Sequence, residues 1–287
     1  MDMKSSKIIL PIMLAPMFIL AGCQPPTKLL SICPGKPTLL DAAAVLRAHS
    51  QNAVAFKAFG RCRLEYYADH KTRTENLSLK MAVNPPAEFY LQGDISIVPK
   101  AVILGANQQE FWLAIKPKEI SAYFWGTWKG QNDFRQVLSP RILLEALGVT
   151  AVDATDNWSF SNQGPYDILT KTNPDGSPAK KIYVYSCDYS VRRIEYFDPD
   201  GKPAVTAELD GYRSVTAGFS APTVIRLTNN FANSSDNSVK SVKITLSSMT
   251  PCQFTDPQRK QLFAPLPNQA YKNKYIIIDG RPVEMRE

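Results

Sequence analysis

The chain has 287 residues, of which 33 are Lys or Arg and 26 are Asp or Glu, so its formal net charge is +7. Hydrophobic residues make up 44% of it, which excludes a disordered protein and provides for a sizeable core. No run of basic residues is longer than two, so the positive charge is spread out. A spread basic excess favours contact with anionic membrane lipid over a nucleic-acid interface.

The N-terminus has the pattern of a bacterial export signal. Lys4 and Lys7 precede an apolar stretch at 8–19, and the following Leu20-Ala21-Gly22-Cys23 resembles a lipobox. We therefore expect residues 1–22 to be removed as a signal peptide and Cys23 to carry acyl chains such as palmitate, which anchor the protein stably. The alternative is a spanning helix, but the stretch contains two prolines and is shorter than the roughly 20 residues needed to cross a bilayer.

Gln24, directly after the cysteine predicted to be acylated, indicates which membrane holds the anchor. In enterobacterial lipoproteins an Asp at this position retains the protein in the inner membrane, so by resemblance Gln24 is permissive for the outer membrane. In either membrane the protein is expected to face the periplasm. The proline-rich residues 23–37 are predicted to form the acylated N-terminus and an extended tether. A β domain is expected at 38–270 and a C-terminal tail at 271–287.

Four cysteines remain besides the one predicted to be acylated: Cys33, Cys62, Cys187 and Cys252. In an oxidising compartment they are disulfide candidates, and the sequence leaves all three pairings open. Inert buried thiols are the alternative. Their wide spacing, with no C-x-x-C and no nearby histidine, argues against a metal site or a redox dithiol, so no cofactor is expected.

The element pattern is mainly β with two or three helices. One helix is predicted at 39–49, with Thr38 as N-cap and His49 as a polar residue at its end. A second is predicted at 140–147, between the N-cap Ser139 and Gly148. Strands are predicted at residues 61–67, 77–84, 88–93, 110–116, 120–125, 158–161, 166–171, 181–187, 192–197, 205–209, 223–228 and 240–248. Turn sequences at 173–176 and 198–201 predict antiparallel hairpins.

Apolar and polar residues alternate in these strands, most clearly at 77–84 and 241–247. Such a sheet has one apolar and one wet face. About ten antiparallel strands cannot stay flat, and few helices are available to cover the apolar face. The sequence therefore predicts a curved sheet with a partly open apolar concavity; a fully packed β core is the alternative.

The order of elements over about 39–267 resembles the LolA/LolB superfamily of lipoprotein carriers. It comprises an N-terminal helix, strands that include Glu110-Phe111-Trp112-Leu113, the helix Pro140 to Gly148, further hairpins, and Leu262-Phe263 followed by a proline-rich stretch. This resemblance implies a half-open antiparallel barrel covered by helices, whose cavity holds acyl chains of lipoproteins or lipids, with a periplasmic carrier protein as a possible partner. The cavity is expected to be lined by Leu77, Leu79, Met81, Phe89, Leu91, Phe111, Leu113, Ile182, Val184, Val242, Ile244 and Leu246.

LolB-like proteins also carry a protruding apolar loop that enters lipid. In this chain the corresponding segment is 95–105, with Ile97, Val98, Val102, Ile103 and Leu104 as the predicted membrane-contact residues. The alternative is that 102–104 folds back as another strand or as a lid helix.

No catalytic motif supports an enzyme. His49 and His70 are the only histidines, and G-x-S-x-G, H-E-x-x-H and a phosphate-binding glycine loop are all missing from the sequence. Ser177-Pro178-Ala179-Lys180 and Ser235-Asp236-Asn237 match two penicillin-binding elements, but the first follows a turn and the third element is missing. Two functions remain: an acyl-chain carrier or acceptor in lipoprotein or lipid transfer at the outer membrane, or a non-enzymatic structural or stress-sensing envelope module that binds a protein partner.

Overall fold

The computed structural model describes residues 31–68, 71–96, 98–117, 121–128, 138–152, 157–231, 239–278 and 280–285. The predicted signal peptide, Cys23, His70 and Ile97 lie outside these residues. From residue 31 on, the described residues belong to one compact unit.

One large, mainly antiparallel sheet dominates this unit. Its strand order is β17-β16-β6-β5-β4-β3-β2-β1-β15-β14-β11-β10-β9-β8-β7, and a separate two-stranded ribbon pairs β12 with β13. The strands are β1 (Phe56–Ala68), β2 (Lys71–Asn84), β3 (Glu88–Ile95), β4 (Val98–Ala106), β5 (Glu110–Ile115), β6 (Ala122–Thr127), β7 (Trp158–Gln163), β8 (Tyr166–Thr172), β9 (Pro178–Tyr185), β10 (Val191–Phe197), β11 (Pro203–Asp210), β12 (Arg213–Thr216), β13 (Phe219–Ala221), β14 (Val224–Asn229), β15 (Val239–Pro251), β16 (Asn273–Ile278) and β17 (Arg281–Glu284).

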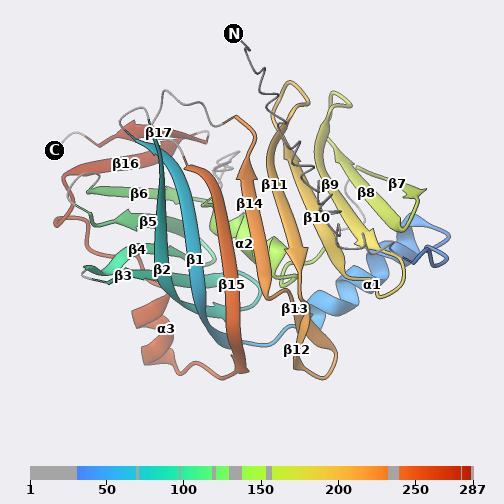
Figure 1. Ribbon diagram of the computed structural model, residues 1–287, viewed down its shortest axis with the longest axis horizontal. Coiled ribbons are helices and arrows are strands. Elements are labelled where there is room, and N and C mark those ends of the chain that lie inside the picture. Colours follow the sequence, from blue (N-terminus) through green and yellow to red (C-terminus); the bar gives the residue numbers. More distant parts are fainter. Residues whose placement is uncertain are drawn as a thin grey trace, which may run out of the picture. The chain divides into compact units, whose positions relative to one another are not determined.

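The sheet is strongly curved. In Figure 1 the strands β3 to β6 run crosswise to β1, β15 and β14, so the two halves of the sheet face different directions. Among the described strands β17 and β7 are the two edges and do not pair with each other. The sequence prediction of a curved, mainly antiparallel sheet is confirmed, whereas the sheet is open and does not close into the expected half-open barrel.

Two helices cover the apolar face. α1 (Leu39–Gln51) begins at Thr38, whose hydroxyl accepts a hydrogen bond from the Asp41 amide at 3.2 Å, as the sequence predicts. α2 (Pro140–Ala146) follows Ser139. Leu46 of α1 and Leu143 of α2 pack into the same core cluster as the apolar residues of the strands. Figure 1 shows α2 behind β15 and β14, and α1 crossing behind the lower ends of the right-hand strands.

A third helix, α3 (Asp256–Leu262), is held against β3 by one ion pair. The Arg259 guanidinium donates to both carboxylate oxygens of Glu88, at 2.7 and 3.0 Å. Burial opposes ionisation of Glu88, but the hydrogen bonds from Arg259 and Asn84 and the Arg259 charge outweigh it, so the pKa of Glu88 lies below its usual value. The two-point contact fixes the position of α3 beside the end of the strand.

Most of the segment predicted to be a protruding membrane-contact loop is a strand, so the alternative that 102–104 folds back as another strand is confirmed. Val98, Val102, Ile103 and Leu104 belong to β4, which pairs with β3 and β5. Leu104 faces the main core, and Ile103 lies on the opposite face in a second apolar cluster with Trp112 and Tyr123. Because both faces of β4 are covered from Ala101 on, this part of the strand is apolar, and the alternation expected of a half-exposed strand is missing there.

Residues after 270 are not a separate tail. Tyr271 packs in the second cluster, with its ring centroid 5.6 Å from that of Tyr123. The strands β16 and β17 then extend the sheet, and β16 pairs with β6 in parallel. Tyr271 thus helps to cover the apolar outer face of β4 to β6.

Candidate functional site

The structure brings all of the predicted cavity residues together. The twelve belong to one core cluster under α1 and α2, and none is more than 5% exposed. Most of this surface is therefore closed to solvent in the observed conformation. Of the twelve, Ile182 alone also lines the open cavity described next.

That cavity has a volume of about 320 Å³, at the small end of the range for ligand pockets. It lies where α1, the end of α2, β9 and β10 meet. Its apolar wall includes Leu46, Ile182 and Ile194, which also belong to the core cluster. The cavity is therefore a water-accessible extension of the apolar interior. Its polar lining consists of His49, Arg141, Glu145, Thr150, Lys180, Asp188, Tyr189, Ser190, Tyr212 and Ser220.

Glu145 is the most strongly constrained charge in this lining. Its carboxylate accepts hydrogen bonds from the Lys180 ammonium at 3.0 Å and from the Tyr196 hydroxyl at 2.8 Å. Burial disfavours the charged carboxylate, but the charge of Lys180, both hydrogen bonds and the charge of Arg141 outweigh it, so the pKa of Glu145 is lowered. Both partners are less than a fifth exposed, so the pair is a fixed charged feature where the cavity meets the core.

His49 has a structural role in this wall. Its Nε2 lies 2.9 Å from the Ser220 carbonyl oxygen, and its ring centroid is 5.1 Å from that of Phe219. This agrees with the sequence prediction of a polar edge residue. Within the described residues no group of three or more His, Cys, Asp or Glu side chains is placed to hold a metal ion.

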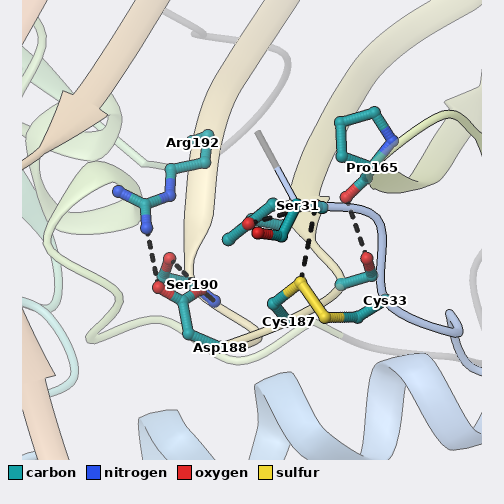
Figure 2. The surroundings of a disulfide bond; sticks show 9 residues. Ser31, Cys33, Pro165, Cys187, Asp188, Ser190 and Arg192 are labelled. Carbon is teal, nitrogen blue, oxygen red and sulfur yellow. Dashed lines mark hydrogen bonds and ion pairs between the residues drawn. A yellow bond between two sulfur atoms is a disulfide. The ribbon is translucent and has the colours of Figure 1, made fainter. Parts of the chain in front are cut away.

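The turn between β9 and β10 forms one side of the cavity and carries a disulfide. Cys187 is bonded to Cys33, with the Cα atoms 5.0 Å apart, so the prediction of at least one disulfide is confirmed (Figure 2). Asp188, the next residue, accepts hydrogen bonds from the amide and hydroxyl of Ser190 at 2.9 and 2.6 Å. It also pairs with Arg192 at 2.7 Å, which ties the turn to the following strand.

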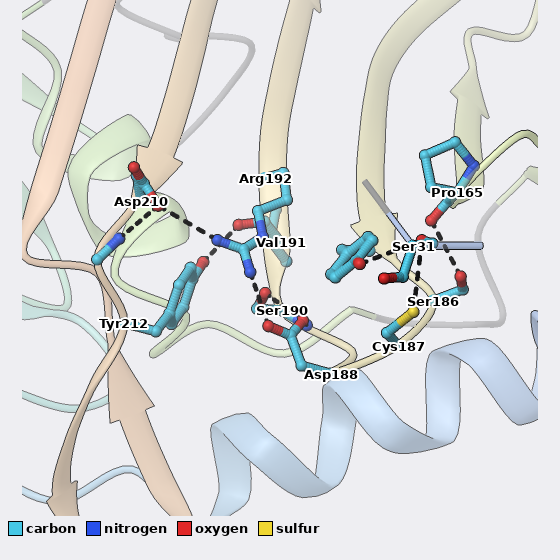
Figure 3. A network of polar contacts seen from close by, with 12 residues as sticks. Ser31, Pro165, Ser186, Cys187, Asp188, Ser190, Val191, Arg192, Asp210 and Tyr212 are labelled. Atoms are coloured by element: carbon cyan, nitrogen blue, oxygen red, sulfur yellow. Dashed lines mark hydrogen bonds and ion pairs between the residues drawn. The ribbon is translucent and has the colours of Figure 1, made fainter. Parts of the chain in front are cut away.

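Arg192 extends this polar network away from the disulfide. Its guanidinium also lies 3.4 Å from a carboxylate oxygen of Asp210, and the Tyr212 hydroxyl donates to the carbonyl of Val191 (Figure 3). Burial is the main reason why the pKa of Tyr212 is raised, so this hydroxyl stays protonated and remains a donor. The network fixes the cavity wall from the β9–β10 turn to β11.

The other two cysteines are free thiols. Cys62 is buried in the core, and burial raises its pKa to about 12. Cys252 is half-buried, and burial likewise raises its pKa. Both are poor nucleophiles at neutral pH, since the thiolate is the reactive form.

Residues 31–38, which we call the N-terminal strap, are bound to the domain. The strap was expected to be largely part of a free tether. In addition to the disulfide, the Lys36 amide donates to the Asp167 carboxylate at 2.8 Å, and the Ser31 carbonyl accepts from the Tyr185 hydroxyl at 3.1 Å. A Cβ on Gly35 would lie 2.0 Å from a carboxylate oxygen of Asp167, so only glycine permits this approach.

Asp167 connects the strap with the cavity. It is 1% exposed and also accepts hydrogen bonds from Asn162 at 2.7 Å and from the Tyr189 hydroxyl at 3.1 Å. Tyr189 lines the cavity. Sequence reasoning missed this connection, because Asp167 has the appearance of an ordinary polar residue in a predicted strand.

None of the helices in the described ranges is both long and apolar enough to span a bilayer. Neither a protein-family model nor a curated protein matches the sequence. Solved structures do resemble it in fold. A domain named for outer membrane lipoprotein sorting, from Vibrio parahaemolyticus, is 11% identical with a TM-score of 0.52, and the match covers 77% of this chain and 94% of that one.

Two further structures are similar at a TM-score of 0.49. One is a LolA superfamily protein from Nitrosomonas europaea, 10% identical, with 78% of this chain and 97% of that chain covered. The other is a DUF1329 family protein from Desulfovibrio piger, 12% identical, with 76% and 94% covered. At these identities the likeness concerns the fold.

Proposed function

Because the chain has a LolA/LolB-like fold, we propose that it is a lipid-anchored periplasmic protein that binds acyl chains and takes part in lipoprotein or lipid transfer at the outer membrane. The anchor is the acylated Cys23 that the lipobox predicts. The cargo site is the cavity between α1, α2 and the strands β9 and β10. Cargo moves passively, so the protein itself requires no nucleotide, metal or other cofactor.

The observation that carries this proposal is the cavity's mixed lining. Leu46, Ile182 and Ile194 belong to the apolar core as well, while charged and hydroxyl groups line the same cavity. An acyl chain attached to a polar group has the same two-part character. The chain would lie against Ile182 and Ile194, and the polar group would lie near Arg141 and the Glu145–Lys180 pair.

The observed cavity is small, so a long acyl chain would have to displace some core contacts. Each methylene that leaves water contributes about 0.8 kcal/mol. Part of this is lost where the chain separates side chains that already pack on one another. The twelve core residues predicted to line the cavity are the surface along which a chain can extend from the open cavity under α2.

The closed core supports a second candidate. Leu79, Phe111 and Ile244 are at most 2% exposed, as expected for a permanently filled interior. A filled interior favours a structural or stress-sensing envelope module that binds a protein partner and uses the same fold without cargo.

Displacement of a fluorescent fatty acid from the purified protein separates the two candidates. Val152→Trp adds bulk in the cavity wall, and we expect it to weaken binding by about tenfold, equivalent to roughly 1.4 kcal/mol. Val239→Trp is the matched control, since Val239 is also a half-buried valine packed against the core but does not line the cavity. If the parent binds no fatty acid, the carrier proposal fails and the protein-binding module is favoured.

A further inference from the structure

Two exposed apolar side chains lie at the N-terminal strap, Ile32 within it and Leu40 just after it in α1. Ile32 is 75% exposed and Leu40 is 69% exposed, the highest values among the large apolar residues of the described ranges. The next is Phe59 at 52%, on β1 in another part of the sheet. Exposure of a large aliphatic side chain is costly when it recurs within a few residues, and it indicates a surface that contacts something apolar.

The strap cannot turn these side chains inward. Ile32 lies next to Cys33, which the disulfide fixes on the β9–β10 turn (Figure 2). Leu40 lies in the first turn of α1, directly after the Thr38 cap, and the buried residues of that helix, Ala42, Ala43 and Leu46, face the domain. The hydrogen bond from the Lys36 amide to the buried Asp167 holds the chain between them. Both side chains are thus displayed by a rigid support.

We infer that the strap and the first turn of α1, through Ile32 and Leu40, are the surface by which this protein lies on the lipid bilayer. The inference rests on the proposed function in one respect, namely the acylated Cys23. Ser31 follows that cysteine by eight residues, which span at most about 28 Å when fully extended. The anchor therefore keeps the strap within reach of the membrane surface, and no other exposed large apolar side chain of the described residues is so near the anchor in sequence.

This contact is apolar in character. The Lys36 ammonium lies over the Tyr189 ring, 5.1 Å from its centroid, and Asp41 brings a negative charge close to Leu40. Charges of both signs next to the apolar side chains give little net attraction for anionic lipid. The strap should thus bind phosphatidylcholine vesicles as well as anionic ones, with little dependence on salt.

The same surface adjoins the cavity. Cys187 ties the strap to the turn whose next residues, Asp188 to Ser190, line the cavity, and α1 contributes Leu46 to the cavity wall. Contact at the strap would place the cavity close to the lipid surface. Acyl chains could then pass between bilayer and cavity over a short distance, with little exposure to water.

The test uses the acylated protein in vesicles that contain bromine-labelled lipid, which quenches tryptophan fluorescence at short range. The variants Ile32→Trp and Leu40→Trp each add one tryptophan at the strap, and Phe59→Trp adds one at an exposed control position. We expect the added fluorescence of the two strap variants to be quenched and blue-shifted, and that of the control to be unaffected, in phosphatidylcholine vesicles and in vesicles with phosphatidylglycerol. Equal quenching at all three positions, or quenching at the control alone, would overturn the inference.

Transfer kinetics provide a second measurement. Ile32→Glu and Leu40→Glu should slow uptake of a fluorescent fatty acid from vesicles severalfold, while displacement of the same probe from the protein in solution stays unchanged. Phe59→Glu should affect neither. Unchanged uptake in both strap variants would contradict the inference. If the parent takes up no fatty acid at all, the proposed function fails, and the quenching experiment still decides whether the strap contacts lipid.

Discussion

Removal of the Cys33–Cys187 disulfide should destabilise the domain substantially. The two cysteines are 154 residues apart, so the bond constrains a long segment of the unfolded chain. The chain-entropy model gives about 5 kcal/mol for a loop of this size. This is an upper limit, because the strap can detach from the folded domain once the bond is gone. For a domain of this length the loss corresponds to a fall in thermal midpoint of about 10–20 °C at most.

The assay is urea unfolding of Cys33→Ser/Cys187→Ser against the parent, with Cys252→Ser as a control that removes a free thiol. We expect the double variant to unfold at lower urea and the control to match the parent. Alkylation of the acylated, unreduced protein in denaturant should modify Cys62 and Cys252 alone. Identical unfolding midpoints for parent and double variant, or four reactive thiols, would refute the reasoning.

Four further predictions follow from burial, charge and the lipobox. Lys180→Met should lower the free energy of unfolding at neutral pH by about 1–3 kcal/mol, since it leaves Glu145 partly buried without its cation, whereas Lys181→Met should have little effect. Folding lowers the pKa of Glu145, so its charge stabilises the fold fully above its ordinary pKa of 4.5, and this stabilisation is lost as pH falls through the lower folded value. The free energy of unfolding of Glu145→Gln, measured against pH, should lack this pH-dependent stabilisation. Leu79→Glu should lower the free energy of unfolding by about 4 kcal/mol or more, measured by thermal or urea unfolding, while Ser78→Glu on the wet face should lower it little. An unchanged unfolding midpoint for Leu79→Glu would mean that water reaches the interior. Cys23→Ser should abolish incorporation of an alkyne fatty acid and release the protein from membranes, and persistent labelling would rule out the lipobox.

Local patterns predicted most of the secondary structure. The Thr38 cap and the apolar stripe after it predicted α1, Pro140 and Gly148 bounded α2, and the alternation from Leu77 onward placed β2 with the correct face inward. These features act within a few residues, because a cap or a period of two depends only on the local backbone. The order of such elements also predicted a fold that resembles a solved lipoprotein-sorting domain.

Contacts between distant segments could not be predicted in this way. The sequence left three disulfide pairings open. In the structure Gly35 of the strap packs on Asp167 of β8, and Cys33 is bonded to Cys187 in the β9–β10 turn. In sequence Ile103 resembles a membrane-contact residue. In the structure it packs in an apolar cluster with Tyr271, which lies far along the chain.

The sequence by itself thus determined most of the elements and the apolar face of the sheet, and it predicts the anchor at Cys23. The tertiary structure alone decided that most of this apolar face is buried and that the cavity beside it is lined by Glu145 and Lys180. It also decided that the side chains of Ile32 and Leu40 are exposed. The physical reason is that burial depends on which distant segment covers a side chain. An apolar residue has the same sequence signature whether it lines a cavity, fills a core or meets a membrane.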